Sequence, residues 1–480
     1  MRCLLIVCLA LLSFRGAVAA ETDPRIDTYV AAGIERLGVP GAAVVVRREG
    51  RVVHLGYYGR EGLDDHATPV TSGTLFGTGS VGKTVTAALI HDLVREGLVE
   101  LDRDVTGYLP WLKLPKEAAN VTVRDLLRMQ SGLGPMAQRA FHGPGMFDAQ
   151  AEAFARTLAS APLEADPTRG WAYSNADYIL LGLVAETVGN KPFNVLVDER
   201  IFRPANIASA TFDASAAARR GLQLHRESLG RMKRIPADDM PAAMAPAGLL
   251  FMNAPDLASF ASLQLADLAA NADAKRWQPA VRDALAPGYD FGSGWIFARN
   301  GDASMVFYEG GGSGMSSAIY LLPGQDVAVV VMFNAAAYPG TWQLGRGIVE
   351  IVSGRNPAQP SGSIYGLAHA GLIAVAIFCA VALAAAAAVR IGRTRGKITD
   401  HTSIRLGWGF AGITGLIGAS IWHQSTNGVL VEFTSLPFRS SWNGWLPELA
   451  IGLPLLVGSF AGAAAILLIP GRRVGVGRRS

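Results

Sequence analysis

Residues 74–84 read TLFGTGSVGKT, and an apolar run over residues 85–93 follows at once. Apolar residues recur in this run at helical spacing, which predicts a helix that begins near Ser80 and ends near Glu96. Gly97 follows, and glycine commonly ends a helix. Two chemistries fit the glycine-rich start of this helix, and the choice between them decides the function of the chain.

The first candidate is a phosphate-binding loop, because residues 77–84 match the pattern G-x-x-x-x-G-K-[ST] at every fixed position. Such a loop needs a buried apolar strand directly before it, yet only three of the seven residues 70–76 are apolar. It also needs a later apolar strand that ends in Asp and holds magnesium. The best later strand, 327–333, is followed by Asn334. We therefore expect no nucleotide partner.

The second candidate is the pair Ser80 and Lys83, which lie three positions apart and so share one face of the helix. A serine hydroxyl is a weak nucleophile unless a neighbouring base takes its proton. A lysine can be that base where burial lowers its pKa. Ser80 would also lie in the first helical turn, where free N–H groups and the helix dipole stabilise a developing oxyanion. Chance matches to S-x-x-K are common, and a capping serine with a solvated lysine is the ordinary interpretation, so the hypothesis needs partners elsewhere in the chain.

Other catalytic chemistries find little support in the sequence. No cluster of His, Cys, Asp and Glu has metal-ligand spacing, and the nucleophile motif G-x-S-x-G does not occur. We therefore expect neither a metal nor a cofactor.

Residues 1–20 are typical of a secretory signal peptide. Arg2 supplies the positive charge, residues 4–12 the apolar core and residues 17–19 an A-x-A cleavage site. The folded domain that follows, residues 21–358, is expected to lie on the periplasmic or extracellular side of the cytoplasmic membrane. Nucleotides are scarce there, which disfavours the phosphate loop further.

Three C-terminal stretches are candidates for membrane spans, at 367–389, 406–422 and 449–469. Five basic residues lie between the first two stretches, and four arginines follow the third. Basic loops stay on the cytoplasmic side, so the C-terminus is predicted to be cytoplasmic, and the basic charge reports topology rather than a nucleic-acid partner. Residues 359–366 would be a linker, and 367–480 the membrane domain of a multi-pass inner-membrane protein.

The rest of the chain predicts a mixture of strands and helices. The expected strands are 41–47 and 52–58, which form a hairpin, and 294–297, 305–308, 317–322 and 327–333. The expected helices begin at Val121 with Thr122 as N-cap, cover 179–188, begin at Pro255, and cover 341–352.

Several motifs in a fixed order make the chain recognisable. They are residues 74–76 (TLF) before 80–83 (SVGK), 121–127 (VTVRDLL) running to 131–133 (SGL), 173–178 (YSNADY), 246–249 (PAGL) and the glycine-rich strand start at Gly310. With these motifs, residues 25–354 resemble the serine hydrolases related to class C β-lactamases and penicillin-binding D-alanyl-D-alanine carboxypeptidases, a group that also includes esterases. The resemblance implies an α/β (α+β) fold, in which an antiparallel sheet with helices on both faces lies beside a mostly helical subdomain.

The resemblance also implies roles for individual residues, in a site between the sheet and the helical subdomain. Ser80 would be the acylated nucleophile. Lys83 and Tyr173 would share proton transfer, and which of them acts as the base stays open. Asn175 would position Lys83 and the substrate. The backbone N–H groups of Ser80 and Gly312 would form the oxyanion hole.

One position departs from the family pattern, in which the third motif is usually Lys-Thr-Gly or His-x-Gly. Here the aligned triplet is Glu309-Gly310-Gly311, and it is expected to contact the substrate. The family's cation helps to hold a substrate carboxylate, whereas an ionised Glu309 would repel it. The two glycines still allow close approach of the backbone, so acyl transfer to an ester, amide or cationic substrate is favoured over β-lactam or D-Ala-D-Ala recognition.

The leading hypothesis is a membrane-tethered extracytoplasmic serine hydrolase. It would act through an acyl-enzyme on an ester, an amide or a D-amino-acid peptide, with a small-molecule or peptidoglycan-like substrate. The alternative is a catalytically weak binding or regulatory protein of the cell envelope that keeps the same fold, and Glu309 motivates this alternative.

Overall fold

A computed structural model describes residues 22–395 of the 480-residue chain, except 135–136, 138–149, 229–230, 238–240, 272–274, 300–304, 313, 338 and 361–363. The predicted signal peptide, 1–20, and the predicted spans 406–422 and 449–469 lie outside the described residues.

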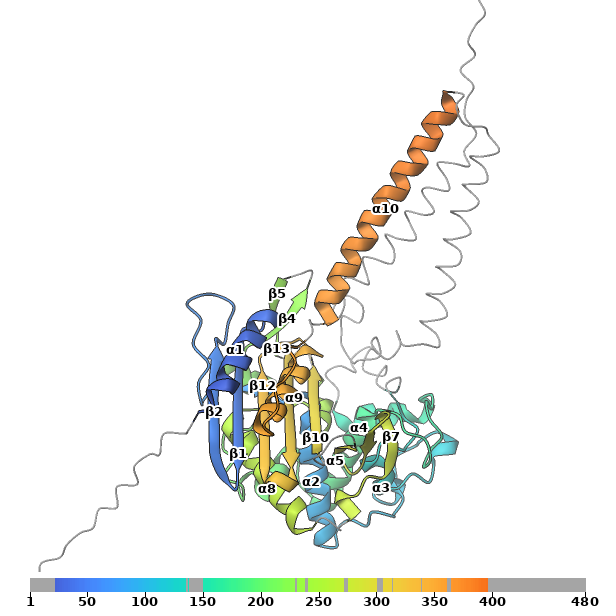
Figure 1. Cartoon of the computed structure of the whole chain (residues 1–480). Coiled ribbons are helices and arrows are strands. Elements are labelled where there is room, and N and C mark those ends of the chain that lie inside the picture. The colour runs from blue at the N-terminus through green and yellow to red at the C-terminus, as the bar shows by residue number, and fades with distance from the viewer. Residues whose placement is uncertain are drawn as a thin grey trace, which may run out of the picture.

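An antiparallel sheet of eight strands forms the centre of the domain (Figure 1). Its strands, in spatial order, are β2 (Arg51–Gly59), β1 (Gly41–Arg48), β12 (Val327–Phe333), β11 (Met315–Leu322), β10 (Met305–Gly312), β9 (Ile296–Ala298), β8 (Tyr289–Phe291) and β7 (Val281–Ala286). The N-terminal hairpin joins the C-terminal strands because β1 pairs with β12. β11 and β12 are buried along their whole length, and their mostly apolar sequences are typical of strands that are covered on both faces.

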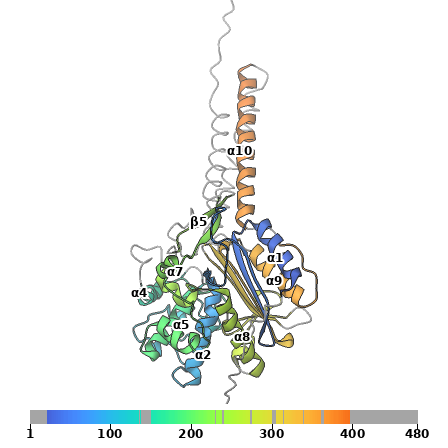
Figure 2. The same cartoon turned by 90° about the vertical axis from the view of Figure 1, so that its left-hand side faces the viewer.

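Helices cover both faces of this sheet (Figure 2). On one face lie α1 (Pro24–Leu37) and α9 (Gly340–Val352), and on the other lie α8 (Ala254–Ala270) and α2 (Gly82–Arg95). The sequence determines where α1 begins and ends. Asp23 is the N-cap and Pro24 the first helical residue, and Gly38 is the C-cap in the left-handed conformation.

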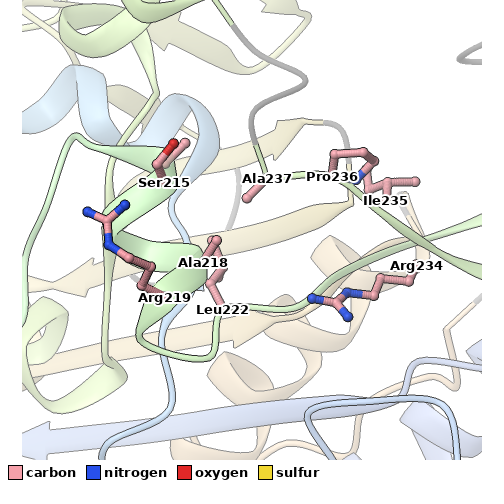
Figure 3. Close-up of a pocket in the computed structure, with 9 residues that line it drawn as sticks. Ser215, Ala218, Arg219, Leu222, Arg234, Ile235, Pro236 and Ala237 are labelled. Carbon is pink, nitrogen blue, oxygen red and sulfur yellow. The ribbon is translucent and has the colours of Figure 1, made fainter.

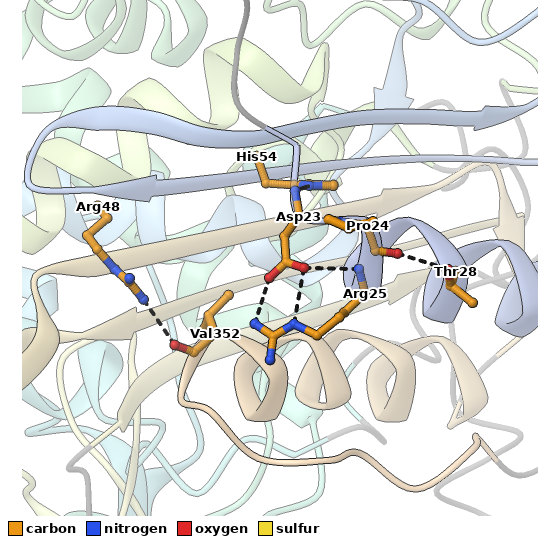
Figure 4. Close-up of polar contacts among 7 residues, drawn as sticks. All are labelled: Asp23, Pro24, Arg25, Thr28, Arg48, His54 and Val352. Carbon is orange, nitrogen blue, oxygen red and sulfur yellow. Dashed lines mark hydrogen bonds and ion pairs between the residues drawn. The ribbon is translucent and has the colours of Figure 1, made fainter.

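The start of α1 is tied to the sheet by polar contacts (Figure 4). The Asp23 carboxylate pairs with the Arg25 guanidinium at 2.7 Å, and the Asp23 N–H donates to His54 Nδ1 at 3.2 Å. Because Nδ1 accepts, the neutral ring carries its proton on Nε2, which lies 3.0 Å from the Tyr58 hydroxyl. Tyr58 in turn donates to Asp27 of α1 at 2.8 Å.

A mostly helical region lies beside the sheet. It contains α3 (Val123–Leu127), α4 (Ala151–Thr157), α5 (Asn175–Gly189), α6 (Phe193–Val197), the π-turn η6 (Asp198–Phe202) and α7 (Ala214–Arg219). Short 3₁₀ turns are η1 (Gly79–Val81), η2 (Val105–Gly107), η3 (Lys116–Ala118), η5 (Leu158–Ser160), η7 (Ala242–Ala247), η8 (Lys275–Trp277) and η9 (Pro323–Gln325). α5 is the central helix of this region, because its first eleven residues are buried and it contacts α2, α3, α4 and α6.

Two small sheets connect the helical region to the main sheet. β3 (Phe76–Gly77) pairs with β6 (Phe251–Met252), and β13 (Ala335–Ala336), β4 (Leu224–Ser228) and β5 (Arg231–Ile235) form the other. The long helix α10 (Ile364–Thr394) extends away from the domain near β4 and β5 (Figure 1).

The helix α10 coincides with the first predicted membrane span, 367–389. Within the part of the chain that the structure describes, no helix is both long enough and apolar enough to cross a membrane. The three spans therefore remain predictions.

The predicted architecture of the folded domain is confirmed. The expected hairpin is β1–β2, the four later strands are β9 to β12, and the helix after the glycine-rich stretch is η1 followed by α2. Thr122 caps α3 with a reciprocal capping box. Among the elements that have no counterpart in the prediction are α1, α6, α7, β4, β5, β7 and β8.

Asn334 joins the end of β12 to the N-terminal hairpin. Its side-chain oxygen accepts from Gly41 N at 2.8 Å, and its amide nitrogen donates to Arg60 O and Glu61 O at 3.0 Å each. The residue is buried, so every one of these partners would lose its bond without gaining water.

We expect Asn334→Ala to lower the free energy of unfolding by about 2–4 kcal/mol, because the substitution leaves buried backbone groups unsatisfied. Urea denaturation followed by tryptophan fluorescence measures this change. The exposed Asn271→Ala serves as the control and should change stability by less than about 0.5 kcal/mol. Equal stability of the two variants would show that Asn334 does not hold the sheet together.

Candidate active site

Ser80 lies on a tight turn between β3 and α2. Gly79 in this turn has φ of +50°, in the left-handed region that favours glycine. The Thr78 N–H donates to Leu250 O at 2.9 Å, and the Ser317 hydroxyl donates to Thr78 O at 2.5 Å. The turn is therefore held both by the segment that leads into β6 and by β11 of the main sheet.

Lys83 follows Ser80 by one helical turn, and its side chain is completely buried. Its nitrogen Nζ lies 3.2 Å from Ser80 Oγ, 2.5 Å from Asn175 Oδ1 and 2.5 Å from Ala247 O. Burial lowers the pKa of Lys83, and the neighbouring Tyr173 acts in the opposite direction with a smaller effect. A lowered pKa increases the fraction of neutral amine, which is the form that can accept a proton.

The hydrogen-bond partners of Lys83 can satisfy a neutral amine. Such an amine has two N–H donors and one lone pair. Asn175 Oδ1 and Ala247 O are acceptors and can take the two donors, which leaves the lone pair for the hydroxyl of Ser80. The same three contacts would also satisfy the three N–H groups of the ammonium form, so Lys83 can hold a proton after taking it.

Tyr173 and Asn175 reach Ser80 from the start of α5. Ser174, between them, is the N-cap, and its hydroxyl accepts an N–H from the first helical turn at 3.1 Å. The Tyr173 hydroxyl lies 2.5 Å from Ser80 Oγ, and Lys83 Nζ lies 5.0 Å from the centre of the Tyr173 ring. The structure thus brings together the four side chains that the sequence singled out.

Strand β10 passes directly beside the turn of Ser80. A Cβ on Gly310 would lie 3.0 Å from Ser80 N, and a Cβ on Gly79 would lie 2.9 Å from both N and O of Gly311. The N–H and C=O of one strand residue point to the same side and alternate along the strand. The N and O of Gly311 lie on the side of the Ser80 turn, so the N–H and C=O of its neighbour Gly312 point to the other side. Gly311 rather than Gly312 is therefore the strand residue whose N–H is placed to contribute to the predicted oxyanion hole.

Glu309 is not brought to the site. Its two carboxylate oxygens each lie 2.7 Å from the guanidinium of Arg346 on α9, and one of them accepts from the Tyr320 hydroxyl at 2.8 Å. These partners lie on the face of the sheet that α9 covers, opposite to Ser80. The predicted substrate contact of the Glu309 side chain is therefore wrong, because side chains alternate between the two faces of a strand.

Tyr308 is a site residue that sequence reasoning missed. It lies one position before Glu309 and so faces the site, where it is 2% exposed and contacts the Tyr173 hydroxyl. Burial raises the pKa of Tyr308, which keeps the phenol neutral. The signal was present in the sequence: the third motif ends in glycine, and Tyr308-Glu309-Gly310 fits it as well as the triplet one residue later.

A buried carboxyl group lies behind the site. One oxygen of Asp177 accepts from the Ser131 hydroxyl at 2.6 Å and from the Ser174 hydroxyl at 2.7 Å, and the other oxygen has no hydrogen-bond partner. Burial raises the pKa of Asp177 to about 8. This cluster joins the loop after α3 to the start of α5, and so it sets the position of Tyr173.

Other candidate sites lie apart from these side chains. A hollow of about 560 Å³ opens between α7 and the end of β5, where Arg219 and Arg234 flank apolar residues such as Leu222 (Figure 3). Ile235 lines it and also lies beside Gly314 in the β10–β11 turn. The side chains around Ser80 do not line this hollow, so it is distinct from the cluster of Ser80, Lys83 and Tyr173. In the described part of the chain, no three His, Cys, Asp or Glu side chains are grouped so as to hold a metal ion.

Comparisons with known proteins find relatives that match most of the folded domain. A family model described as Beta-lactamase matches residues 26–349. "Protein flp" of Staphylococcus aureus (strain MRSA252) is 23% identical over 323 residues, which cover 65% of this chain and 63% of the relative. "Esterase EstB" of Burkholderia gladioli is 30% identical over 223 residues, which cover 43% of this chain and 56% of the relative. The match thus spans less than two thirds of the length of either relative.

Solved structures share the fold. The octameric penicillin-binding protein homologue from Pyrococcus abyssi superposes with a TM-score of 0.61 at 22% identity, over 70% of this chain and 78% of that one. A class C beta lactamase from Rhodobacter sphaeroides superposes with a TM-score of 0.58 at 21% identity, over 69% of this chain and all of that one (100%). At such identities the likeness concerns the fold alone.

The raised pKa of Asp177 generates a prediction about stability and pH. In the unfolded chain this carboxyl ionises near pH ~4, but in the folded protein it stays protonated up to about pH 8. The free energy of unfolding is therefore highest, as far as this carboxyl is concerned, below about pH 4. It falls progressively as the pH rises to about 8, because the unfolded chain ionises the carboxyl and the folded protein does not. Asp177→Asn cannot ionise, so it should gain stability over the natural protein by about 2–4 kcal/mol between pH 4 and pH 8.

Urea denaturation at pH 5, 6.5 and 8 measures this difference. The exposed Asp65→Asn is the control and should show the same pH dependence as the natural protein. A constant stability difference between Asp177→Asn and the natural protein at all three pH values would mean that Asp177 is already ionised in the fold.

Proposed function

This chain belongs to the Beta-lactamase family, and we propose that it is a serine hydrolase that acts through an acyl-enzyme on an ester, an amide or a D-amino-acid peptide. The observation that carries the proposal is the contact of one hydroxyl with two proton-transfer groups. Ser80 Oγ lies 2.5 Å from the Tyr173 hydroxyl and 3.2 Å from Lys83 Nζ. This is the geometry that an activated serine nucleophile requires.

Acylation begins when the Ser80 hydroxyl gives its proton to neutral Lys83 and its oxygen bonds to the substrate carbonyl carbon. The carbonyl oxygen becomes an oxyanion, which the N–H groups of Ser80 and Gly311 stabilise. The bond to the leaving group then breaks. Tyr173 gives its proton to the leaving group and regains a proton from Lys83.

Deacylation repeats these steps with water as the nucleophile. Water loses a proton to the same Tyr173 and Lys83 pair as its oxygen bonds to the acyl carbon. The ester bond to Ser80 breaks, and the serine oxygen takes the proton back. Asn175 holds Lys83 in place throughout, because its amide oxygen lies 2.5 Å from Lys83 Nζ.

The alternative, a catalytically weak envelope protein, was motivated by Glu309 in the third motif. The pairing of Glu309 with Arg346 weighs against this alternative, because the carboxylate lies on the other face of the sheet.

We expect a fluorophosphonate probe to label Ser80 stoichiometrically and Ser80→Ala to abolish the labelling. Lys83→Met and Tyr173→Phe should slow labelling by about 10²- to 10⁴-fold, because each removes a proton-transfer group. Mass spectrometry of the labelled peptide checks the site. The exposed Ser160→Ala is the control and should label at the natural rate. Labelling that persists in Ser80→Ala would refute the proposed nucleophile.

We also propose that the C-terminal region tethers the hydrolase to the membrane. Residues 367–389 carry no Asp, Glu, Lys or Arg, and the basic residues after the first and third apolar stretches favour cytoplasmic positions. The catalytic domain would then lie outside the membrane, in reach of envelope substrates.

A topology experiment tests the tether. Alkaline phosphatase is active only outside the cytoplasm, so a fusion after Pro360 should be active and a fusion after Ser480 should be inactive. β-Galactosidase fusions at the same two positions provide the reciprocal control. An active phosphatase at Ser480 would contradict both the three-span count and the orientation.

A further inference from the structure

We propose that Tyr308 restricts the leaving-group side of the site to groups that carry no carboxylate beside the scissile bond. The inference rests on the proposed function and narrows its substrate class to acyl donors with uncharged leaving groups. It concerns a residue that reaches the site only because of the register of β10.

The orientation of Tyr308 follows from its neighbours. Glu309 points at Arg346 and Tyr320 on the α9 face. Gly310, on the other side of Glu309, points at the backbone of Ser80. Since side chains alternate along a strand, Tyr308 shares the face of Gly310 and points into the site.

Tyr308 lies on the leaving-group side. It contacts the hydroxyl of Tyr173, which gives its proton to the leaving group in the proposed mechanism. Two more aromatic rings pack next to Tyr308. The ring centres of Phe291 and Tyr308 are 6.4 Å apart, and those of Trp171 and Phe291 are 5.9 Å apart. The surroundings of the Tyr173 hydroxyl on this side are therefore aromatic, and the Tyr308 phenol is the polar group among them.

Burial raises the pKa of Tyr308, which keeps the phenol uncharged, and it lowers the pKa of Lys83, which favours the neutral amine that the proposed base requires. Apart from burial, the influences on these two pKa values come from Tyr173 and Tyr178. A substrate carboxylate here would lose water without gaining a cationic partner.

Among the described groups that influence the pKa of Tyr308 or of Lys83, Lys83 itself is the one that could compensate such a charge. A carboxylate beside it would raise the pKa of Lys83 and favour the ammonium form. The ammonium cannot take the proton of Ser80. An anionic leaving group would thus both bind weakly and suppress the general base.

Two esters with the same acyl group test this inference: 3-acetoxybenzoate and its methyl ester. Both esters form the same acetyl-enzyme, so the deacylation step is the same for both. A difference in their kcat/KM values therefore arises in acylation. Each kcat/KM is divided by the rate constant for hydrolysis of the same ester by hydroxide, which corrects for its intrinsic reactivity. For the natural protein this normalised kcat/KM should be more than about a hundredfold higher for the methyl ester than for the carboxylate ester. Equal values would overturn the inference.

Three variants test whether Tyr308 causes the preference for the methyl ester. Tyr308→Lys supplies a cation and should move the ratio toward the carboxylate ester by at least about tenfold, whatever its effect on the absolute rates. Tyr308→Phe keeps the ring without the hydroxyl and should keep the preference for the methyl ester. Glu309→Gln is the matched control on the opposite face and should leave the ratio unchanged. A ratio that shifts with Glu309→Gln and not with Tyr308→Lys would refute the assigned register.

Fluorophosphonate labelling distinguishes the possible failures. A natural protein that labels at Ser80 but hydrolyses both esters equally would contradict only the role of Tyr308. A natural protein that neither labels nor hydrolyses either ester would contradict the proposed function and this inference together. Labelling of Tyr308→Lys reports whether that variant is folded, and if it is not, the ratios of the natural protein and Tyr308→Phe decide.

Discussion

The site depends on the burial of one amine. Lys83 is completely buried, and an amine so placed needs a hydrogen-bond partner for every donor. Its partners come from three separate parts of the chain: Ser80 before α2, Asn175 on α5 and Ala247 at the end of η7. The site can form only when these three segments are in place, so the fold of the helical region and the chemistry of the serine depend on the same few contacts.

A second constraint is the close approach of β10 to the turn of Ser80. Glycines at positions 79 and 310 leave no side chain between the strand and the turn of Ser80. On the opposite face the strand carries Glu309, which is held by Arg346. The ion pair and the glycines together fix β10 in the register that turns Tyr308 toward Tyr173 and the Gly311 donor toward Ser80.

The sequence predicted those parts of the molecule that short-range patterns determine. Ser80 and Lys83 share a helix face, and Tyr173 and Asn175 flank an N-cap, so their proximity within each pair follows from local geometry. Glu309 shows where this reasoning stops. A shift of one residue in a strand exchanges its two faces, and the three consecutive glycines after Glu309 allow two alignments of the same motif. Elements such as β5, with its exposed basic residues, lack the apolar periodicity from which a strand can be predicted.

The pairing of β1 with β12 has a consequence for how the protein is made. Ala42 lies opposite Phe333, near the other end of the domain. During synthesis the β1–β2 hairpin therefore emerges long before its partner strand, and the mostly apolar edge of β1 stays unpaired until nearly the whole domain has left the ribosome. Contacts so distant in sequence slow folding, and an unpaired strand edge promotes aggregation. A chaperone that keeps the early hairpin apart from other nascent chains would therefore raise the yield of the folded domain.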